Sequence, residues 1–502
     1  MMRAAIAAAA TGGALAFSVL PRPEPWLAFA YAVGVVLLAR SAPSPRAAGA
    51  RAWLASAVAA AGVFHWVVPL LERFAHFPWA LAALVALLLY AALAIPTGLA
   101  SWLAEHLRRR GAPAALVHAA ALMVLTGLAP TLFPWRASTS WIAWTELSQV
   151  ASLGGVALMD GLLFGCASCA AMACWAAGRG ARLCGARYFG LALLPLLTGH
   201  FVGAHLLHDD DEAWRRARRV SVGVLQPNIE IEDKHDPRQA AAHLANLRAL
   251  SDDAAEAGAE LVVWPETAFP YPFERSRRVI PRAYRPSNVL PSIVGVRTDG
   301  AECERFNSAV AVNRQGRILG RSDKVELLAF GETIPLWDWL PPLQARFRCP
   351  GLSAGESATP LVLAGARFGI LVCYEDVLPN HARQVAARTE VLINITNDGW
   401  FGRSAGAQLH HLAARWRAIE TRRDLVRAVN TGVSAHVDSA GRERLRLVPF
   451  SRAFGVAEAA RRNQLSLFVR FGDQTTPLAF AFLLACIVGG RRRNMAKRQP
   501  AR

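Results

Sequence analysis

The stretch FGILVCYED, residues 368–376, decides the fold of one half of this chain. Its first five residues, Phe368 to Val372, carry no polar side chain and form a short run of the kind that is buried in a sheet. A cysteine and two acidic residues follow where the strand should end. Polar side chains at the end of a buried strand stand on a rigid scaffold, where chemistry can be placed. Cys373 is therefore a candidate nucleophile.

Similar runs recur on both sides of this stretch. Across residues 219–468, short runs rich in β-branched residues alternate with longer amphipathic segments. The longer segments predict helices at 236–257 and 408–423. The short runs predict strands at 220–226, 259–266, 292–298, 308–313, 368–375, 391–398 and 432–438. This alternation over about 250 residues is typical of one layered α/β domain.

Two further strand ends carry charged residues. Glu266 follows the buried run in VVWPETAFP (262–270), and Lys324 precedes the triplet FGE at 330–332. Taken alone, a buried cysteine is most often inert, and a single glutamate or lysine usually caps a helix or faces solvent. The occurrence of Glu266, Lys324 and Cys373 in one domain favours a shared catalytic site over three unrelated residues.

These three residue types support covalent acyl transfer. A thiol with an ordinary pKa of about 8.5 is mostly protonated at neutral pH, so a base must remove its proton. Glu266 can act as that base if burial raises its pKa. Lys324 and a backbone N–H after Cys373 can stabilise the oxyanion that forms when sulfur attacks an ester. The predicted intermediate is a thioester on Cys373.

The rest of the chain has the composition of a membrane protein. Of 502 residues, 53% are hydrophobic. A helix that spans a membrane needs roughly 20 residues. Eight hydrophobic stretches come near that length and are candidate spans: 4–20, 25–39, 53–71, 78–103, 113–133, 153–177, 188–207 and 475–490. The first could instead be a signal peptide, although Arg3 provides little positive charge for one. We expect a membrane domain with seven spans at 1–207 and a C-terminal transmembrane helix at 475–490.

The positive charges indicate an orientation. The net charge of +18 would suit nucleic acid or an anionic membrane surface. If the N-terminus is cytoplasmic, 16 Lys and Arg residues lie in cytoplasmic segments and three in short loops on the other side. This asymmetry matches the positive-inside rule and favours the membrane. It predicts a bacterial inner-membrane protein with both termini and a basic tail (491–502) in the cytoplasm, and domain 219–468 in the periplasm.

Several short sequence motifs resemble those of a known superfamily. VVWPETAFP, KVELLAFGETIPL, GILVCYED and NITNDGWFG are similar to the signatures of nitrilases, which use a Glu–Lys–Cys triad in an α-β-β-α sandwich. FGE, CYE, NDGWFG, RAIETRR (417–423) and RAVNTG (427–432), with the spans on both sides, resemble its membrane-bound branch, the apolipoprotein N-acyltransferase family. The expected fold is an α-helical membrane domain with about eight spans plus this sandwich.

The resemblance implies a function and further site residues. The expected reaction moves an acyl chain from a phospholipid to the N-terminal amine of a diacylglyceryl-cysteine lipoprotein, without metal or organic cofactor, in a monomer with no nucleic acid partner. Glu332 and Glu375 are expected to orient Lys324, although Glu375 could simply accept backbone N–H bonds. Tyr374 is expected to shape the pocket. Candidate substrate-binding residues, for which ordinary packing is the alternative, are His235, Trp337, Trp400 and Phe401.

The chain also departs from the family pattern. Pro227 stands where a glycine is usual, His235 where a tryptophan is usual, and Leu328-Ala329 where Val-Pro is usual. These changes leave the triad intact, so they bear on substrate preference and not on the reaction class. A membrane-tethered amidase and a non-enzymatic lipid-binding protein are the alternative functions. An oxidising periplasm would allow a disulfide between Cys303 and Cys349 if the fold brings the two residues together.

Overall fold

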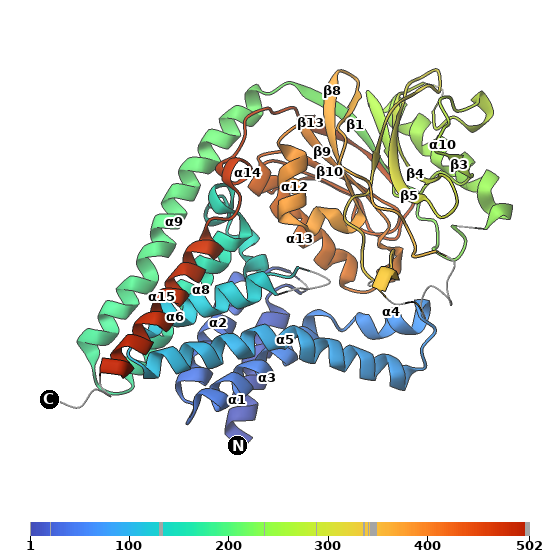
Figure 1. Ribbon diagram of the computed structural model, residues 1–502. Coiled ribbons are helices and arrows are strands. Elements are labelled where there is room, and N and C mark those ends of the chain that lie inside the picture. The colour runs from blue at the N-terminus through green and yellow to red at the C-terminus, as the bar shows by residue number, and fades with distance from the viewer. Residues whose placement is uncertain are drawn as a thin grey trace. The chain divides into compact units, whose positions relative to one another are not determined.

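The computed structural model describes residues 2–20, 22–129, 134–234, 236–287, 289–334, 337–339, 341 and 349–496. The chain divides into two compact units (Figure 1). The first comprises residues 1–131, 135–208 and 471–502, and the second comprises 132–134 and 209–470. The first unit is helical, and the second contains the strands.

The helical unit packs its helices closely. Helix α3 lies against α1 and α5, while α6 lies against α5, α8 and α15. A side chain at Gly12 would overlap the carbonyl oxygen of Ala55, so the approach of α1 to α3 requires glycine there. The helices are α1 (Met2–Phe17), α2 (Pro25–Arg40), α3 (Pro45–Val63), α4 (Val67–Phe74), α5 (Trp79–Arg109), α6 (Ala114–Leu128), η1 (Ala137–Ala143), α7 (Thr145–Ser148), α8 (Ala151–Ala177), α9 (Arg182–Arg216) and α15 (Thr475–Ala496).

The predicted membrane stretches fall on helices of different length, and the stretch at 53–71 is divided between α3 and α4. Among the described residues, three helices are long and apolar enough to cross a membrane: α5, α8 and α9. The pair α3 and α4, bent by 55°, adds a fourth if it forms one span. The other apolar helices, α1, α2, α6 and residues 475–489 of α15, are shorter, at 10–17 residues.

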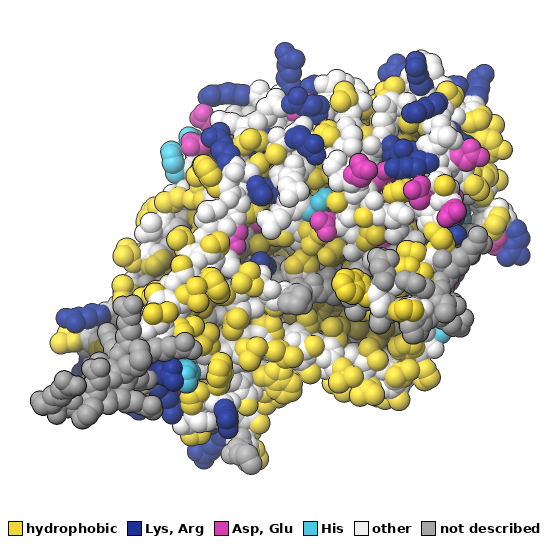
Figure 2. Space-filling model, viewed as in Figure 1, with side chains coloured by type: hydrophobic (Ala, Val, Ile, Leu, Met, Phe, Trp, Pro, Cys, Tyr) yellow, Lys and Arg dark blue, Asp and Glu magenta, His cyan; other side chains and the backbone are white. Residues whose placement is uncertain are grey.

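The helical unit exposes apolar side chains. On α5, Leu87 and Leu88 are 61% and 62% exposed. Hydrophobic side chains gather over the helices on the face shown in Figure 2. Water disfavours such a surface, so these helices are suited to an apolar environment.

The second unit contains two sheets. The seven-stranded sheet has the order β13-β1-β2-β4-β5-β6, with β3 paired to β4, and the six-stranded sheet has the order β12-β11-β10-β9-β8-β7. The strands are β1 (Arg219–Gln226), β2 (Leu261–Trp264), β3 (Phe273–Glu274), β4 (Ser292–Asp299), β5 (Arg305–Val312), β6 (Ile318–Asp323), β7 (Leu361–Leu363), β8 (Ala366–Val372), β9 (Val391–Thr396), β10 (Leu425–Val429), β11 (Ala435–Val437), β12 (Glu443–Arg446) and β13 (Ala453–Ala460).

Alternating side chains produce the layers of this unit. Val222 and Val224 of β1 lie in one buried cluster with Ile370 of β8, so this core fills the space between the sheets. Leu225 points to the other face, where it joins Leu247 of α10 (Ala240–Glu256). Helices α12 (Pro379–Ala386) and α13 (Gly406–Thr421) cover the second sheet. The predicted α-β-β-α sandwich is confirmed.

The sequence missed part of the strand pattern. Strands β3, β6, β7, β10, β12 and β13 were not predicted, and the strand predicted at 432–438 is longer than β11, which it contains. The residues of β10 are apolar except for Arg427, which is fully buried. This charged residue interrupts the apolar pattern from which the strand would have been predicted. Strand β13 is rich in alanine, which has low strand propensity, but it pairs with β1 along eight residues. Pairing along a neighbouring strand here overrides local propensity.

The connecting short helices complete the second unit. They are η2 (Pro237–Gln239), η3 (Arg282–Tyr284), η4 (Trp337–Trp339), η5 (Cys373–Val377), η6 (Asp398–Phe401) and α14 (Leu467–Phe471). The strand predicted at 368–375 ends earlier, at Val372, because the chain turns into η5 at Cys373.

Candidate active site

Cys373 lies directly after β8 in a strained turn. Its φ of +54° is in the left-handed region, which costs a residue with a Cβ about 1–2 kcal/mol. Asn394 of β9 holds the turn, because its side-chain amide donates to the carbonyl oxygens of Leu371 and Cys373, both at 3.0 Å. Cys373 is half-buried, so the turn presents it at the end of the sheet rather than inside the core.

Glu266 lies two residues after β2 and is 7% exposed. The turn fits closely against β4, since a side chain at Gly295 would overlap the carbonyl oxygen of Pro265. Oε1 of Glu266 accepts a hydrogen bond from Asn307 Nδ2 at 2.6 Å. Burial raises the pKa of the Glu266 carboxyl, and the positive charge of Lys324 opposes that rise. The carboxyl group therefore has the raised pKa that a general base needs.

Lys324 directly follows β6 and is almost fully buried. Its Nζ lies 2.7 Å from Oε1 and 2.6 Å from Oε2 of Glu332. Burial acts to lower the pKa of Lys324, but the negative charges of Cys373, Glu332 and Glu266 outweigh it and raise that pKa. The side chain is therefore an ammonium group at neutral pH.

The three predicted triad residues act on one another. Burial raises the pKa of the Cys373 thiol, Glu266 raises it further, and Lys324 opposes both. Carboxyl, ammonium and thiol groups from the ends of β2, β6 and β8 thus influence one another's protonation. The fold brings together the residues that the sequence selected.

Glu375 connects two of these strand ends. Its Oε1 accepts from the backbone N–H groups of Val325 and Glu326 at 2.7 and 3.0 Å, and its Oε2 accepts from that of Val372 at 2.7 Å. These contacts match the alternative of simple backbone hydrogen bonding, and they tie the main chain after Lys324 to the strand before the cysteine. Among the described residues, Glu332 is the carboxylate that contacts the Lys324 ammonium directly.

Comparisons with known proteins agree with this geometry. The model of the carbon-nitrogen hydrolase family matches residues 221–456, and that of the apolipoprotein N-acyltransferase N-terminal domain matches 11–178. The apolipoprotein N-acyltransferase of Geobacter metallireducens is 30% identical over 493 residues, which cover 93% of this chain and 89% of that protein. The corresponding protein of Azotobacter vinelandii is 34% identical and covers 92% and 90%. The chain belongs to the apolipoprotein N-acyltransferase family.

Membership of the apolipoprotein N-acyltransferase family makes this chain an acyltransferase that carries a carbon-nitrogen hydrolase domain. Among solved structures, an amidase of the nitrilase superfamily from Nesterenkonia aligns at 16% identity with a TM-score of 0.37, covering 53% of this chain and 98% of that one.

The aromatic residues that the apolipoprotein N-acyltransferase resemblance selected lie in different settings. Trp400 is 46% exposed, whereas the ring of Phe401 packs edge-on against His410, with 6.0 Å between centroids. Trp337 is partly buried in η4, and Tyr374 is also partly buried. His235 lies outside the described residues. The structure therefore gives Phe401 a packing contact and leaves Trp400 accessible.

His410 is a site residue that sequence reasoning missed. Its Nδ1 lies 2.7 Å from Oδ1 of Asp398 and its Nε2 lies 2.8 Å from Oδ1 of Asp376. Burial acts to lower the pKa of His410, but the two aspartates raise it to about 9. A buried imidazolium thus clamps the NDGWFG loop to the turn of Cys373. Among the described residues, no group of three or more His, Cys, Asp or Glu side chains is arranged to hold a metal ion.

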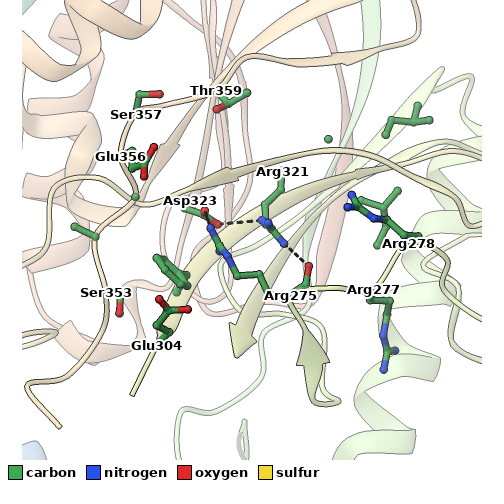
Figure 3. A pocket seen from close by; sticks show the side chains of 16 residues that line it. Arg275, Arg277, Arg278, Glu304, Arg321, Asp323, Ser353, Glu356, Ser357 and Thr359 are labelled. Carbon is green, nitrogen blue, oxygen red and sulfur yellow. Dashed lines mark hydrogen bonds and ion pairs between the residues drawn. The ribbon is translucent and has the colours of Figure 1, made fainter. Parts of the chain in front are cut away.

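A cavity of about 710 Å³ lies elsewhere in the sandwich, and its lining does not include the triad (Figure 3). Arg275 and Arg321 both converge on Asp323, at 2.8 and 3.5 Å. Asp323 immediately precedes Lys324, but neither Lys324 nor Cys373 lines this cavity. The guanidinium group of Arg275 also stacks on the ring of Phe306, 3.8 Å from its centroid.

Proposed function

We propose that this chain transfers an acyl chain from a membrane phospholipid, through a thioester on Cys373, to the N-terminal amine of a diacylglyceryl-cysteine apolipoprotein. The observation that carries the proposal is the convergence of Glu266, Lys324 and Cys373 from three strand ends. Membership of the family supports the substrate class.

In the first half-reaction, Glu266 removes the proton of the Cys373 thiol as sulfur attacks the carbonyl carbon of the phospholipid ester. The negative charge on the carbonyl oxygen is stabilised by Lys324 and by a backbone N–H after Cys373, a type of interaction worth about 3–4 kcal/mol per donor. The C–O bond then breaks, and Glu266 returns the proton to the leaving glycerol oxygen. The products are a lysophospholipid and the acyl-enzyme.

In the second half-reaction, the amine of the apolipoprotein attacks the thioester carbonyl. Glu266 accepts a proton from the attacking nitrogen, and Lys324 again stabilises the oxyanion. The C–S bond breaks, the amide is released, and the thiolate of Cys373 regains its proton from Glu266. Glu332 holds the ammonium of Lys324. The side chains proposed to contact the lipid substrates are those of Tyr374, Trp337, Trp400, Phe401 and His235.

The membrane arrangement is part of the proposal. Seven spans at 1–207 and one at 475–490 would place the domain 219–468 in the periplasm, with both termini and the tail 491–502 in the cytoplasm of a monomeric inner-membrane protein. The apolar helices at these positions and the distribution of arginines support it. Membrane-impermeant thiol labelling of single cysteines placed at 110 and 299 tests it, since only 299 should react from the periplasm.

Incubation of the purified full chain with phospholipid tests the chemistry. Intact-mass analysis should show a hydroxylamine-sensitive acyl adduct that maps to Cys373, absent in Cys373→Ser and retained in the matched control Cys486→Ser. A diacylated lipopeptide should then discharge the adduct as an amide. Discharge to free fatty acid alone would indicate a hydrolase, and a folded wild-type chain that forms no adduct would contradict the covalent mechanism.

A further inference from the structure

A second lysine lies beside the proposed triad. Lys234 is in the turn that follows β1 and is 8% exposed. Its Nζ donates a hydrogen bond to the backbone carbonyl oxygen of Glu266 at 2.8 Å. Among the described residues, no carboxylate forms an ion pair with this ammonium within 4.0 Å. A buried positive charge thus rests against the main chain of the proposed general base.

The composition of the chain shows that a lysine at this place is unusual. Of the 55 Lys and Arg residues, only Lys234, Lys324 and Lys497 are lysines. Two of the three, Lys234 and Lys324, are buried, and the charges of both act on Glu266. Arginine is planar, carries a permanent charge and needs more space, whereas lysine is a compact point charge whose pKa responds to burial. A chain that uses arginine almost everywhere thus has the more compact cation, lysine, at these two buried positions.

The charges facing Lys234 come from three elements. Burial lowers its pKa to about 8, while the negative charges of Glu266 and Cys373 act to raise it. His243 of α10 also faces it, and burial together with Lys234 keeps the pKa of that imidazole low. Since His243 is neutral at pH 7, the negative charges that Lys234 balances are those of the Glu266 carboxylate and, once the thiol has lost its proton, of the Cys373 sulfur.

We propose that Lys234 is a positioning residue of the acyl-transfer site, which fixes the Glu266 main chain and supplies a second positive charge that favours the anionic states of the pocket. This inference rests on the proposed function. Lys324 is already paired with Glu332. Its ammonium therefore balances only part of the negative charge that moves from Glu266 to the sulfur and then to the oxyanion. Lys234 offsets that charge at each step without contacting the substrate.

The small number of lysines permits a direct measurement. The full chain in detergent, labelled with ¹³C at lysine Cε, should give at most three signals, and Lys234→Met identifies the relevant one. We expect its titration midpoint near pH 8, against about 10.4 for an ordinary lysine. In Glu266→Gln the midpoint should fall further, because the carboxylate that favours the charged form is gone. A midpoint near 10.4, or one unaffected by Glu266→Gln, would overturn the proposal.

The rate of acyl-adduct formation on Cys373, measured without an amine acceptor, tests the role. The wild-type rate should decline above about pH 8 as Lys234 loses its proton. Lys234→Met should be at least about tenfold slower at pH 7 and should lack this decline. Lys234→Arg should recover part of the rate and also lack the decline. The matched control Arg238→Met removes an exposed charge four residues away and should behave as the wild type.

The outcomes separate this inference from the proposed function. If the adduct forms and a folded Lys234→Met keeps both the wild-type rate and the alkaline decline, the role of Lys234 is wrong and the covalent mechanism stands. If the wild type forms no adduct, the proposed function fails, and the lysine titration still tests the electrostatic part. A wild-type profile without a decline above pH 8 contradicts the inference even if Lys234→Met does not fold.

Discussion

Asn307 makes a hydrogen bond to only one of the two carboxylate oxygens of Glu266. The Asn307 amide donates to Oε1 at 2.6 Å, whereas Oε2 is buried without a hydrogen-bond partner among the described residues. The backbone carbonyl oxygen of Asn307 also accepts a hydrogen bond from the backbone N–H of Lys324 at 2.8 Å. One residue of β5 therefore aligns the proposed base and the proposed oxyanion-stabilising lysine, and leaves one carboxylate oxygen available for the proton of the thiol.

Asn307→Leu should move the acid limb of acyl-adduct formation to higher pH. The hydrogen bond from Asn307 lowers the pKa of Glu266 against the rise caused by burial, so its loss should raise that pKa further. Adduct formation at pH 7 should slow by about tenfold, because one charge-assisted hydrogen bond is worth about 1.5–3 kcal/mol. Rate against pH measures this, and an unchanged acid limb in the folded variant would contradict it. Asn313→Leu, on an exposed turn, is the control.

Glu332→Gln should slow adduct formation without preventing folding. The variant removes the carboxylate that contacts the Lys324 ammonium at 2.6 Å, so the lysine should lose both its position and part of the stabilisation of its charge. We expect a decrease of about 10²-fold, comparable to the loss of an oxyanion donor. Glu326→Gln changes an exposed carboxylate on the same segment and should have little effect. Equal effects of the two variants would argue against a specific role for Glu332.

His410 should make the stability of the chain fall at alkaline pH. Its folded-state pKa of about 9 is above the ordinary value of 6.5. Its contribution is therefore fully present below about pH 6.5 and is lost as pH rises through about 9, with a magnitude of roughly 3 kcal/mol at most.

Thermal unfolding of the full chain in detergent between pH 6 and 9.5 checks this prediction. The unfolding temperature of the wild type should drop across this range, and His410→Gln should begin lower and drop less. His243→Gln removes an imidazole whose pKa is lowered by burial, so it should retain the alkaline drop. A drop of equal size in His410→Gln would show that other groups cause it.

The disulfide between Cys303 and Cys349 should stabilise the segment before the nucleophile. The two Cα atoms are 5.6 Å apart, and the bond closes a separation of 46 residues. Disulfides of this kind typically contribute about 2–4 kcal/mol. A non-reducing peptide map should recover the two cysteines linked, and Cys303→Ser should lower the unfolding temperature, unlike Cys169→Ser. Free thiols at both positions in protein purified from an oxidising compartment would contradict the pairing.

The sequence was most informative where local pattern and buried structure coincide. The apolar runs before Glu266 and Cys373 are strands of the two sheets, and an apolar run that ends in a polar residue can be recognised from sequence alone. Strand β13 could not be read in this way, because its alanines gain their strand conformation from pairing with β1. Arg427 likewise looks like a break in the sequence, but its Nε donates to Asp376 at 3.1 Å inside the protein.

The sequence by itself determined the layered α/β domain, the apolar helices and the three residues proposed for chemistry, because periodicity and residue type are local properties of the chain. Only the tertiary structure decided how these residues are held. Lys234, Asn307 and His410 become relevant, and the role of Glu375 becomes visible, through contacts with residues that lie 12 to 50 positions away along the chain. Hydrogen bonding and charge balance in a buried site depend on distances in space, which no spacing along the chain encodes.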